Sequence, residues 1–219
     1  MRLTKLEFGS LLSYCPRGGD TADIQLSRQT MRAIKNDAFV EDPPVLMSDW
    51  IASTMERRRP ELPFSSFFRT NSVVLVPLPR SSLLQPDSLW VPERIATALV
   101  KKGFGVRMSP CLTRTRAVRK SAISQAGARP KPTEHFESLA VQGNLGPTED
   151  IVLVDDIVTR GHTIIGAANR LLQAYPSARI RAFAAMRTVS NWTDFANIFD
   201  PQIGLIEYRE ASDDCIRRP

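Results

Sequence analysis

The chain has 219 residues, of which 42% are hydrophobic, and it carries a formal net charge of +6 at pH 7. This length and apolar fraction predict one globular domain that buries a good core and folds alone. No apolar stretch approaches the roughly 20 residues that a membrane span needs, and the first residues lack the apolar core of a signal peptide. Composition therefore excludes a membrane protein and favours a cytoplasmic one.

The first third of the chain is expected to be mainly helical. Apolar residues recur at helical spacing between residues 23 and 39 and again from Leu46 to Met55, before Pro60 ends the pattern. We therefore expect residues 1–70 to form a mainly helical N-terminal extension that packs on the core.

From residue 73 onward, short apolar runs alternate with helical patterns. The predicted strands cover residues 73–79, 106–115, 136–143, 151–156, 178–188 and 203–210. Helices are expected around Val91–Leu99 and Ile164–Tyr175, where apolar residues repeat at the spacing of one buried face. This alternation predicts an α/β domain over residues 71–219, with a mostly parallel central sheet flanked by helices. A C-terminal extension starts at about residue 190.

The segment from residue 117 to 134 is polar and shows no periodicity. It contains Gly127, Pro130 and Pro132, which are typical of irregular structure. Long loops inside compact domains are either functional lids or disordered segments, and both alternatives stay open here.

Cysteine and histidine usage predicts no dedicated metal site. Cys15, Cys111 and Cys215 are far apart and form no CxxC pair, so we expect ordinary reduced thiols. His135 and His162 are the only histidines, which is too few for a histidine-rich site.

The excess of basic residues is concentrated in residues 56–60 and 114–120. The first stretch is typical of a solvated helix C-terminus, where cations are favourable. Such charges also suit nucleic acid or a phosphorylated metabolite, and the net charge alone does not decide between them.

The stretch "VDDIVTRGHT" at residues 154–163 carries the clearest chemistry. Asp155 and Asp156 end the most apolar strand, and ligands of open parallel sheets bind beyond the carboxyl ends of strands. A turn follows and runs into a helix whose first backbone N–H groups favour an anion such as phosphate. The residues of the turn are Thr159, Arg160, Gly161, His162 and Thr163. Together they predict a ligand with a vicinal diol and a phosphate monoester, as in ribose 5-phosphate.

The structural alternative is that the two acids merely end a strand and Thr163 merely caps a helix. A P-loop and a dinucleotide-binding fold are disfavoured, because neither a GxxxxGK(S/T) nor a GxGxxG motif occurs.

The stretch "IVLVDDIVTRGHT" resembles the phosphoribosyl pyrophosphate (PRPP) signature of the type I phosphoribosyltransferases. Arginine at position 160 is similar to the form in amidophosphoribosyltransferases. A looser resemblance to the competence-associated ComF branch runs through residues 73–82, 112–116 and 183–188, although the ComF zinc-binding cysteines are missing. The resemblance covers roughly residues 71–190 and implies the type I phosphoribosyltransferase fold.

The resemblance also implies a Mg²⁺-dependent enzyme that transfers ribose 5-phosphate from PRPP to a nitrogenous acceptor. Asp155 and Asp156 would orient the ribose hydroxyls and favour the positive charge that develops at C1. Residues 159–163 would bind the 5-phosphate. Mg²⁺ would bind mainly through PRPP, with the two aspartates as protein groups that could join it. The pyrophosphate would meet a loop with Arg80 and Ser81 and a flexible hood with basic residues. The hood candidates are Arg114, Arg116, Arg119 and Lys120. Among them, Lys120 is expected to be catalytic together with Asp155 and Asp156.

Two functions stay open at this point. The first is a phosphoribosyltransferase with an unidentified acceptor, or a hydrolase of PRPP. The second is a non-catalytic sensor of PRPP or a ribose 5-phosphate nucleotide, whose basic surface contacts nucleic acid or a protein partner. A homodimer is open in both cases.

Overall fold

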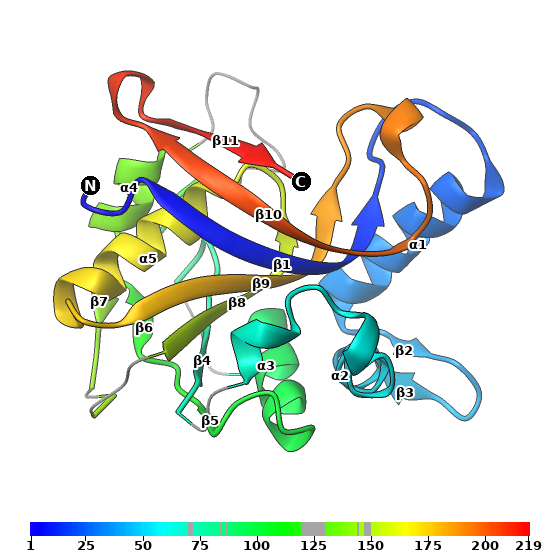
Figure 1. Ribbon diagram of the computed structural model, residues 1–219, viewed down its shortest axis with the longest axis horizontal. Coiled ribbons are helices and arrows are strands. Elements are labelled where there is room, and N and C mark those ends of the chain that lie inside the picture. The colour runs from blue at the N-terminus through cyan, green and yellow to red at the C-terminus, as the bar shows by residue number, and fades with distance from the viewer. Residues whose placement is uncertain (70–71, 84, 86, 120–129, 144, 147–149) are drawn as a thin grey trace.

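The computed structural model describes residues 1–69, 72–83, 85, 87–119, 130–143, 145–146 and 150–219. At its centre is a seven-stranded sheet with the order β11-β10-β1-β9-β8-β4-β5 (Figure 1). Its parallel strands are β1 (Lys5–Tyr14), β4 (Val74–Pro77), β5 (Arg107–Met108), β8 (Asp150–Val158) and β9 (Arg179–Thr188). The antiparallel strands are β10 (Phe199–Arg209) and β11 (Asp214–Arg218). The predicted α/β class with a mostly parallel sheet is confirmed.

Helices cover both faces of this sheet (Figure 1). They are α1 (Ala22–Asn36), α2 (Met47–Arg57), α3 (Val91–Lys101), α4 (Pro132–Glu137) and α5 (His162–Ala174). On β8, Val152 and Val154 pack in the cluster that holds α1, α2 and α3, whereas Ile151 and Leu153 pack in the cluster that holds α5. Because both faces of the strand are buried, it reads as one continuous apolar run.

The N-terminal segment contributes a strand to the central sheet as well as helices. β1 lies between β9 and β10, although residues 1–70 were expected to form a mainly helical extension packed on the core. Phe8, Leu11 and Leu12 on β1 are buried. A Cβ at Gly9 would stand 2.5 Å from the ring of Phe64, so only glycine fits there. β1 escaped prediction because its ten-residue pattern mixes polar and apolar residues without clear alternation.

The segment from 106 to 143 also differs from its prediction. The single strand expected at 106–115 is two strands, β5 and β6 (Leu112–Arg114). β6 leaves the central sheet and pairs with β7 (Leu139–Val141), with Pro110 at the interruption. The strand expected from residue 136 starts later because α4 occupies residues 132–137.

The remaining elements are short connections. Two-stranded pairing joins β2 (Phe39–Val40) to β3 (Val45–Leu46). Within the described residues, longer elements are connected by the 3₁₀ helices η1 (Arg59–Glu61), η2 (Ser65–Phe68), η4 (Trp192–Asp194) and η5 (Glu210–Ser212). None of the helices in the described part of the chain is long and apolar enough to span a membrane.

The three cysteines are free and buried, as the sequence predicts. Burial raises the pKa of the Cys111 thiol to about 11 and that of Cys215 to about 12. Thiols with such pKa values form little thiolate at neutral pH and are therefore poor nucleophiles.

Candidate functional site

Asp155, Asp156 and the turn at residues 159–163 lie at the edge where the parallel strands end. The crossover after β4 leads outward to β5, and the crossover after β8 leads the other way to β9. β8 pairs with β4 only as far as Val154, so Asp155 and Asp156 stand beyond the end of that ladder. A reversal of strand order of this kind is where open α/β sheets bind ligands.

The two carboxylates are held by the backbone that follows them. Asp155 Oδ1 accepts from the Asp156 N–H at 2.9 Å, and Asp156 Oδ1 accepts from the Ile157 N–H at 2.7 Å. Burial, and then the neighbouring Asp156 charge, raise the pKa of Asp155 well above its ordinary range. The pair therefore resists carrying two negative charges at once.

Lys35, on the last turn of α1, reaches the same carboxylates. Its Nζ donates to Asp156 Oδ2 at 2.7 Å. Burial works against the charged lysine, but the attraction of Asp156 outweighs it and raises the pKa of Lys35. Tyr14, at the end of β1, stands near this lysine, and burial raises the pKa of its hydroxyl although Lys35 opposes that shift. Sequence reasoning missed both residues, because nothing in the N-terminal segment indicated which strand end it would approach.

The predicted phosphate loop enters α5 through Gly161. Gly161 has φ 87°, and a Cβ at this position would lie 2.5 Å from the side chain of Ile206. It is the N-cap of α5, and no side chain caps this helix end. The first N–H groups of a helix lack partners within the helix, so this end is suited to an anion. Beside it, the hydroxyls of Thr159 and Thr188 lie 3.2 Å apart.

The C-terminal strand β11 holds this loop from outside. Arg217 Nε donates to the Thr159 carbonyl at 2.7 Å, and Arg217 also donates to the Thr188 carbonyl. Burial, and then the nearby Arg187, lower the pKa of Arg217 to about 10, so it stays charged at neutral pH. The sequence offered no signal for this role, because residues 211–219 matched no motif.

Asp214, also on β11, bonds two side chains of the loop. Its carboxylate lies 2.7 Å from His162 Nε2 and 3.4 Å from Arg160 Nη1. Burial would raise the pKa of the Asp214 carboxyl, but hydrogen bonds from the Cys215 N–H and from His162 outweigh it and keep this pKa below its ordinary value. The other ring nitrogen of His162 lies 2.9 Å from the Pro130 carbonyl. His162 and Arg160 are thus engaged with the protein itself.

The predicted pyrophosphate loop follows β4. Arg80 Nη1 donates to the Leu89 carbonyl at 2.9 Å. The Ser81 carbonyl accepts from the Val118 N–H at 2.8 Å. This loop and the start of the predicted hood are therefore in contact.

Arg114 braces this loop from within. It is buried, and its Nε donates to the Arg80 carbonyl at 3.0 Å. It also donates to the Ser138 hydroxyl and lies 3.0 Å from His135 Nδ1. Burial lowers the pKa of Arg114 to about 10 and that of His135 to about 3, so the histidine is neutral at physiological pH. His135 Nε2 lies 3.4 Å from the Thr163 hydroxyl, which connects the two predicted phosphate sites through one hydrogen-bonded chain.

The other hood candidates lie at the surface or outside the description. Arg116 pairs with Glu137 at 3.0 Å, with both side chains exposed. Arg119 is exposed. Lys120 lies outside the described residues.

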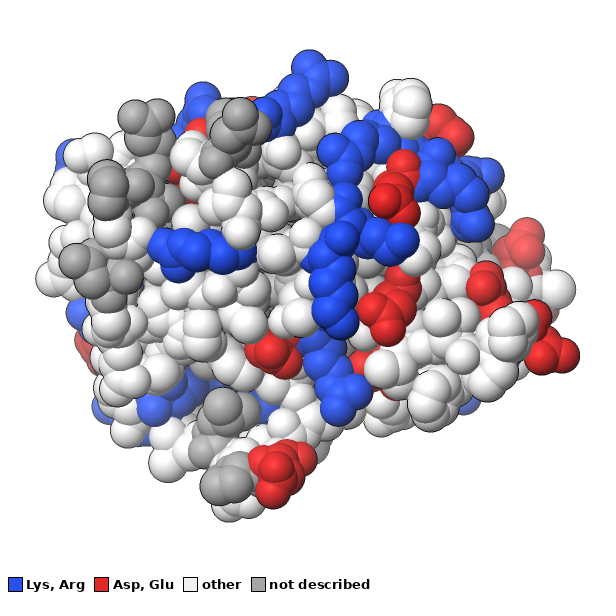
Figure 2. Space-filling model, turned by 90° about the horizontal axis from the view of Figure 1, so that it is seen from below, with Lys and Arg blue, Asp and Glu red and all other residues white. Residues whose placement is uncertain are grey.

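The basic residues that follow α2 make contacts within the protein. Figure 2 shows a stripe of Lys and Arg side chains with acidic side chains beside it, on the face seen from below Figure 1. Arg58 stacks on the Phe199 ring at 4.2 Å, and Arg59 stacks on the Phe104 ring at 4.0 Å. Lys102, at the end of α3, pairs with Glu56 at 2.8 Å. Several of these cations therefore support local packing.

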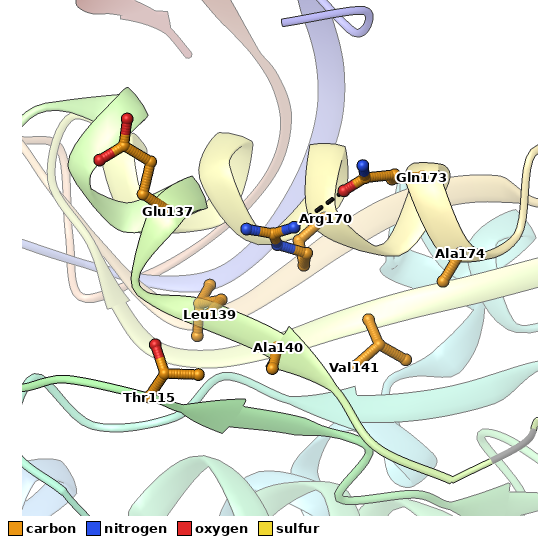
Figure 3. A pocket seen from close by; sticks show the side chains of 8 residues that line it. All are labelled: Thr115, Glu137, Leu139, Ala140, Val141, Arg170, Gln173 and Ala174. Carbon is orange, nitrogen blue, oxygen red and sulfur yellow. Dashed lines mark hydrogen bonds between the residues drawn. The ribbon is translucent and has the colours of Figure 1, made fainter.

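A pocket of about 430 Å³ lies away from the carboxylate pair. Figure 3 shows β7 as its floor and α5 as its wall. Arg170 donates to Gln173 Oε1 at 2.8 Å within it, and it also bonds the Phe136 carbonyl. None of the predicted site residues within the described part of the chain lines this pocket.

Among the described residues, no group of three or more His, Cys, Asp or Glu side chains is arranged to hold a metal ion. No protein-family model matches the chain, and no curated protein matches it either. The functional conclusion therefore comes from the residues at the edge of the sheet.

Proposed function

We propose that the protein is a Mg²⁺-dependent phosphoribosyltransferase that uses PRPP and transfers ribose 5-phosphate to a nitrogenous acceptor or to water. One observation carries this proposal. A carboxylate pair, Asp155 and Asp156, and the uncapped N-terminus of α5 at Gly161 lie close together in sequence on one strand–turn–helix unit. This unit stands at the point where the strand order of the sheet reverses. A diol and a phosphate monoester on the same small molecule fit these two features.

Each part of the site then has a role. Asp155 and Asp156 bind the ribose hydroxyls and favour the positive charge that develops at C1 as its bond to the pyrophosphate oxygen breaks. The α5 N-terminus binds the 5-phosphate. The pyrophosphate leaves with the bonding electron pair, and Arg80 and Ser81 are the candidates to bind it.

Mg²⁺ prefers oxygen ligands, and the adjacent carboxylates are donors of this type, so the residues fit the ion. Most of its ligands would be oxygens of PRPP, and Asp155 and Asp156 are the protein groups that would join them. When bound, the ion would neutralise charge on the pyrophosphate.

A second function is favoured by one specific contact. Arg80 uses one guanidinium nitrogen on the Leu89 carbonyl, which leaves fewer donors for a pyrophosphate. A protein that binds PRPP or a ribose 5-phosphate nucleotide without catalysis would tolerate this arrangement, and its basic surface would be available to nucleic acid or a protein partner.

The experiment that tests these functions follows pyrophosphate release from PRPP and Mg²⁺ in the presence of ammonia or a panel of nucleobases. The Asp155→Asn/Asp156→Asn variant is the control. Acceptor-dependent release indicates transfer, and acceptor-independent release indicates hydrolysis. Tight PRPP binding without release, lost in the control variant, supports the sensor. If the wild type binds neither PRPP nor a ribose 5-phosphate nucleotide, both functions are contradicted.

A further inference from the structure

The N-terminal segment places a lysine on the carboxylate pair. Lys35 and Asp156 are 121 residues apart in sequence, and Lys35 Nζ lies 2.7 Å from Asp156 Oδ2. The Asp156 side chain is 15% exposed and that of Lys35 is 49% exposed. The lysine therefore approaches a largely buried carboxylate from the solvent side, where a ligand would also approach.

The end of α1 is held firmly, so this contact does not depend on a free helix end. Asp37 ends the helix with φ 44°, and its N–H bonds back to the carbonyls of Ala33 and Ile34. The Asp37 carboxylate is buried and accepts from the Ser48 N–H at 2.8 Å and from Arg94 at 3.1 Å. Both α2 and α3 thus fix the turn that carries Lys35.

Of the two carboxylates, only that of Asp156 is oriented by the lysine. Asp156 accepts the Ile157 N–H through Oδ1 and Lys35 through Oδ2, so both of its oxygens have a donor. Asp155 receives the Asp156 N–H, and no lysine or arginine contacts it among the hydrogen bonds and ion pairs of the described residues. Groups that are oriented before binding lose less entropy when the ligand arrives.

We propose that Lys35 is a positioning residue of the ribose site, which orients Asp156 so that the carboxylate pair recognises a vicinal diol and distinguishes ribose 5-phosphate from 2-deoxyribose 5-phosphate. This inference rests on the proposed function, because it assigns the residue a role in binding the same ligand. Lys35 acts through Asp156, whose Oδ2 accepts its hydrogen bond.

The test measures binding of ribose 5-phosphate and of 2-deoxyribose 5-phosphate by calorimetry. The proteins are the wild type, Lys35→Met, Lys35→Arg and the matched control Lys101→Met, whose lysine is exposed in the last turn of α3. Loss of one charge-assisted hydrogen bond should weaken binding of ribose 5-phosphate to Lys35→Met about tenfold. Binding of the deoxy compound should change much less, so the preference for the diol is reduced. Lys35→Arg should restore most of that preference, and Lys101→Met should behave as the wild type.

Thermal unfolding of each variant separates a loss of binding from a loss of folding, and Lys35→Arg keeps the charge if Lys35→Met does not fold. Unchanged discrimination in Lys35→Met overturns the inference while the proposed function stands. Tighter binding to Lys35→Met also overturns it, because Lys35 would then obstruct the diol. If the wild type binds neither ribose 5-phosphate nor PRPP, the proposed function itself fails.

Discussion

The two halves of the candidate site are built in different ways. The phosphate half is a local structure, in which a glycine turn and the start of α5 follow β8 directly. The carboxylate half depends on a distant residue, because Lys35 comes from α1. In addition, the phosphate half is clamped by β11 from the C-terminus. The residues of the phosphate half are therefore adjacent in sequence although β11 holds them in place, whereas the charge balance of the carboxylates comes from a distant helix.

The largest expected effect concerns the local half. Gly161→Ala forces an L residue into φ 87° and places a Cβ against Ile206, which should destabilise the protein by about 2–4 kcal/mol and disrupt ligand binding. Urea denaturation measures this change. The matched control is Gly103→Ala, which has φ 72° but no atom within 4 Å of the added Cβ. An equal loss of unfolding free energy at both positions would show that the contact between the added Cβ and Ile206 contributes nothing.

The next effect tests the clamp from β11. Arg217→Met removes the donors to two carbonyls, at Thr159 and Thr188, and leaves both without their partner. We expect a loss of about 2 kcal/mol in the free energy of unfolding and weaker binding of ribose 5-phosphate. Arg218→Met is the control, since Arg218 forms an ion pair with Glu207 at 3.0 Å and its side chain is 62% exposed. Similar losses in the two variants would contradict a specific role for Arg217.

A smaller, pH-dependent effect tests the carboxylate half. The pKa of Asp155 is raised in the folded protein, so its ionisation costs folding free energy, and stability falls as pH rises from its ordinary value of 3.8 through the raised one. Asp155→Asn lacks this cost. The variant should therefore gain about 1 kcal/mol over the wild type near neutral pH, with a smaller gain at acid pH.

Urea denaturation across the pH range, in the absence of Mg²⁺, measures this gain. At the same time the variant should lose affinity for ribose 5-phosphate, because it lacks one of the two carboxylates that we propose bind the diol. A variant less stable than the wild type at every pH would contradict the assignment.

The smallest effect concerns the contact between the phosphate loop and Asp214 on β11. Asp214→Asn removes a negative charge beside the phosphate loop while the amide can still bond His162. Stability should change by less than about 1 kcal/mol, because partly exposed ion pairs contribute little. Phosphate affinity should rise severalfold at low salt, and the gain should shrink as salt screens the charge. A salt-independent loss of affinity in a titration would contradict this view of Asp214.

Much of the α/β core was predictable because its signals are local. β8 and α5 were expected from a continuous apolar run and from one buried helical face, and both features survive in the structure. The site residues on this unit were predictable for the same reason, since Asp155, Asp156 and Gly161 belong to one short stretch. The same reading placed strands at 73–79 and 178–188, and β4 and β9 confirm them.

The contacts that complete the site were not predictable, because they join segments far apart in the chain. Ten residues of mixed pattern became β1, an internal strand whose neighbours β9 and β10 come from the other end of the sequence. Arg114 was predicted as a pyrophosphate ligand, yet its guanidinium is buried and braces the Arg80 loop from inside.

By itself, the sequence determined the alternating strand–helix class, the acidic strand end and the glycine turn that starts α5, because each of these depends on neighbouring residues and on backbone geometry. Only the tertiary structure decided that Lys35 meets Asp156 and that Arg217 and Asp214 hold the phosphate loop. Such pairings depend on which strands lie side by side. Strand order follows from the burial of the whole sheet between two helical layers, and no short stretch of sequence encodes it.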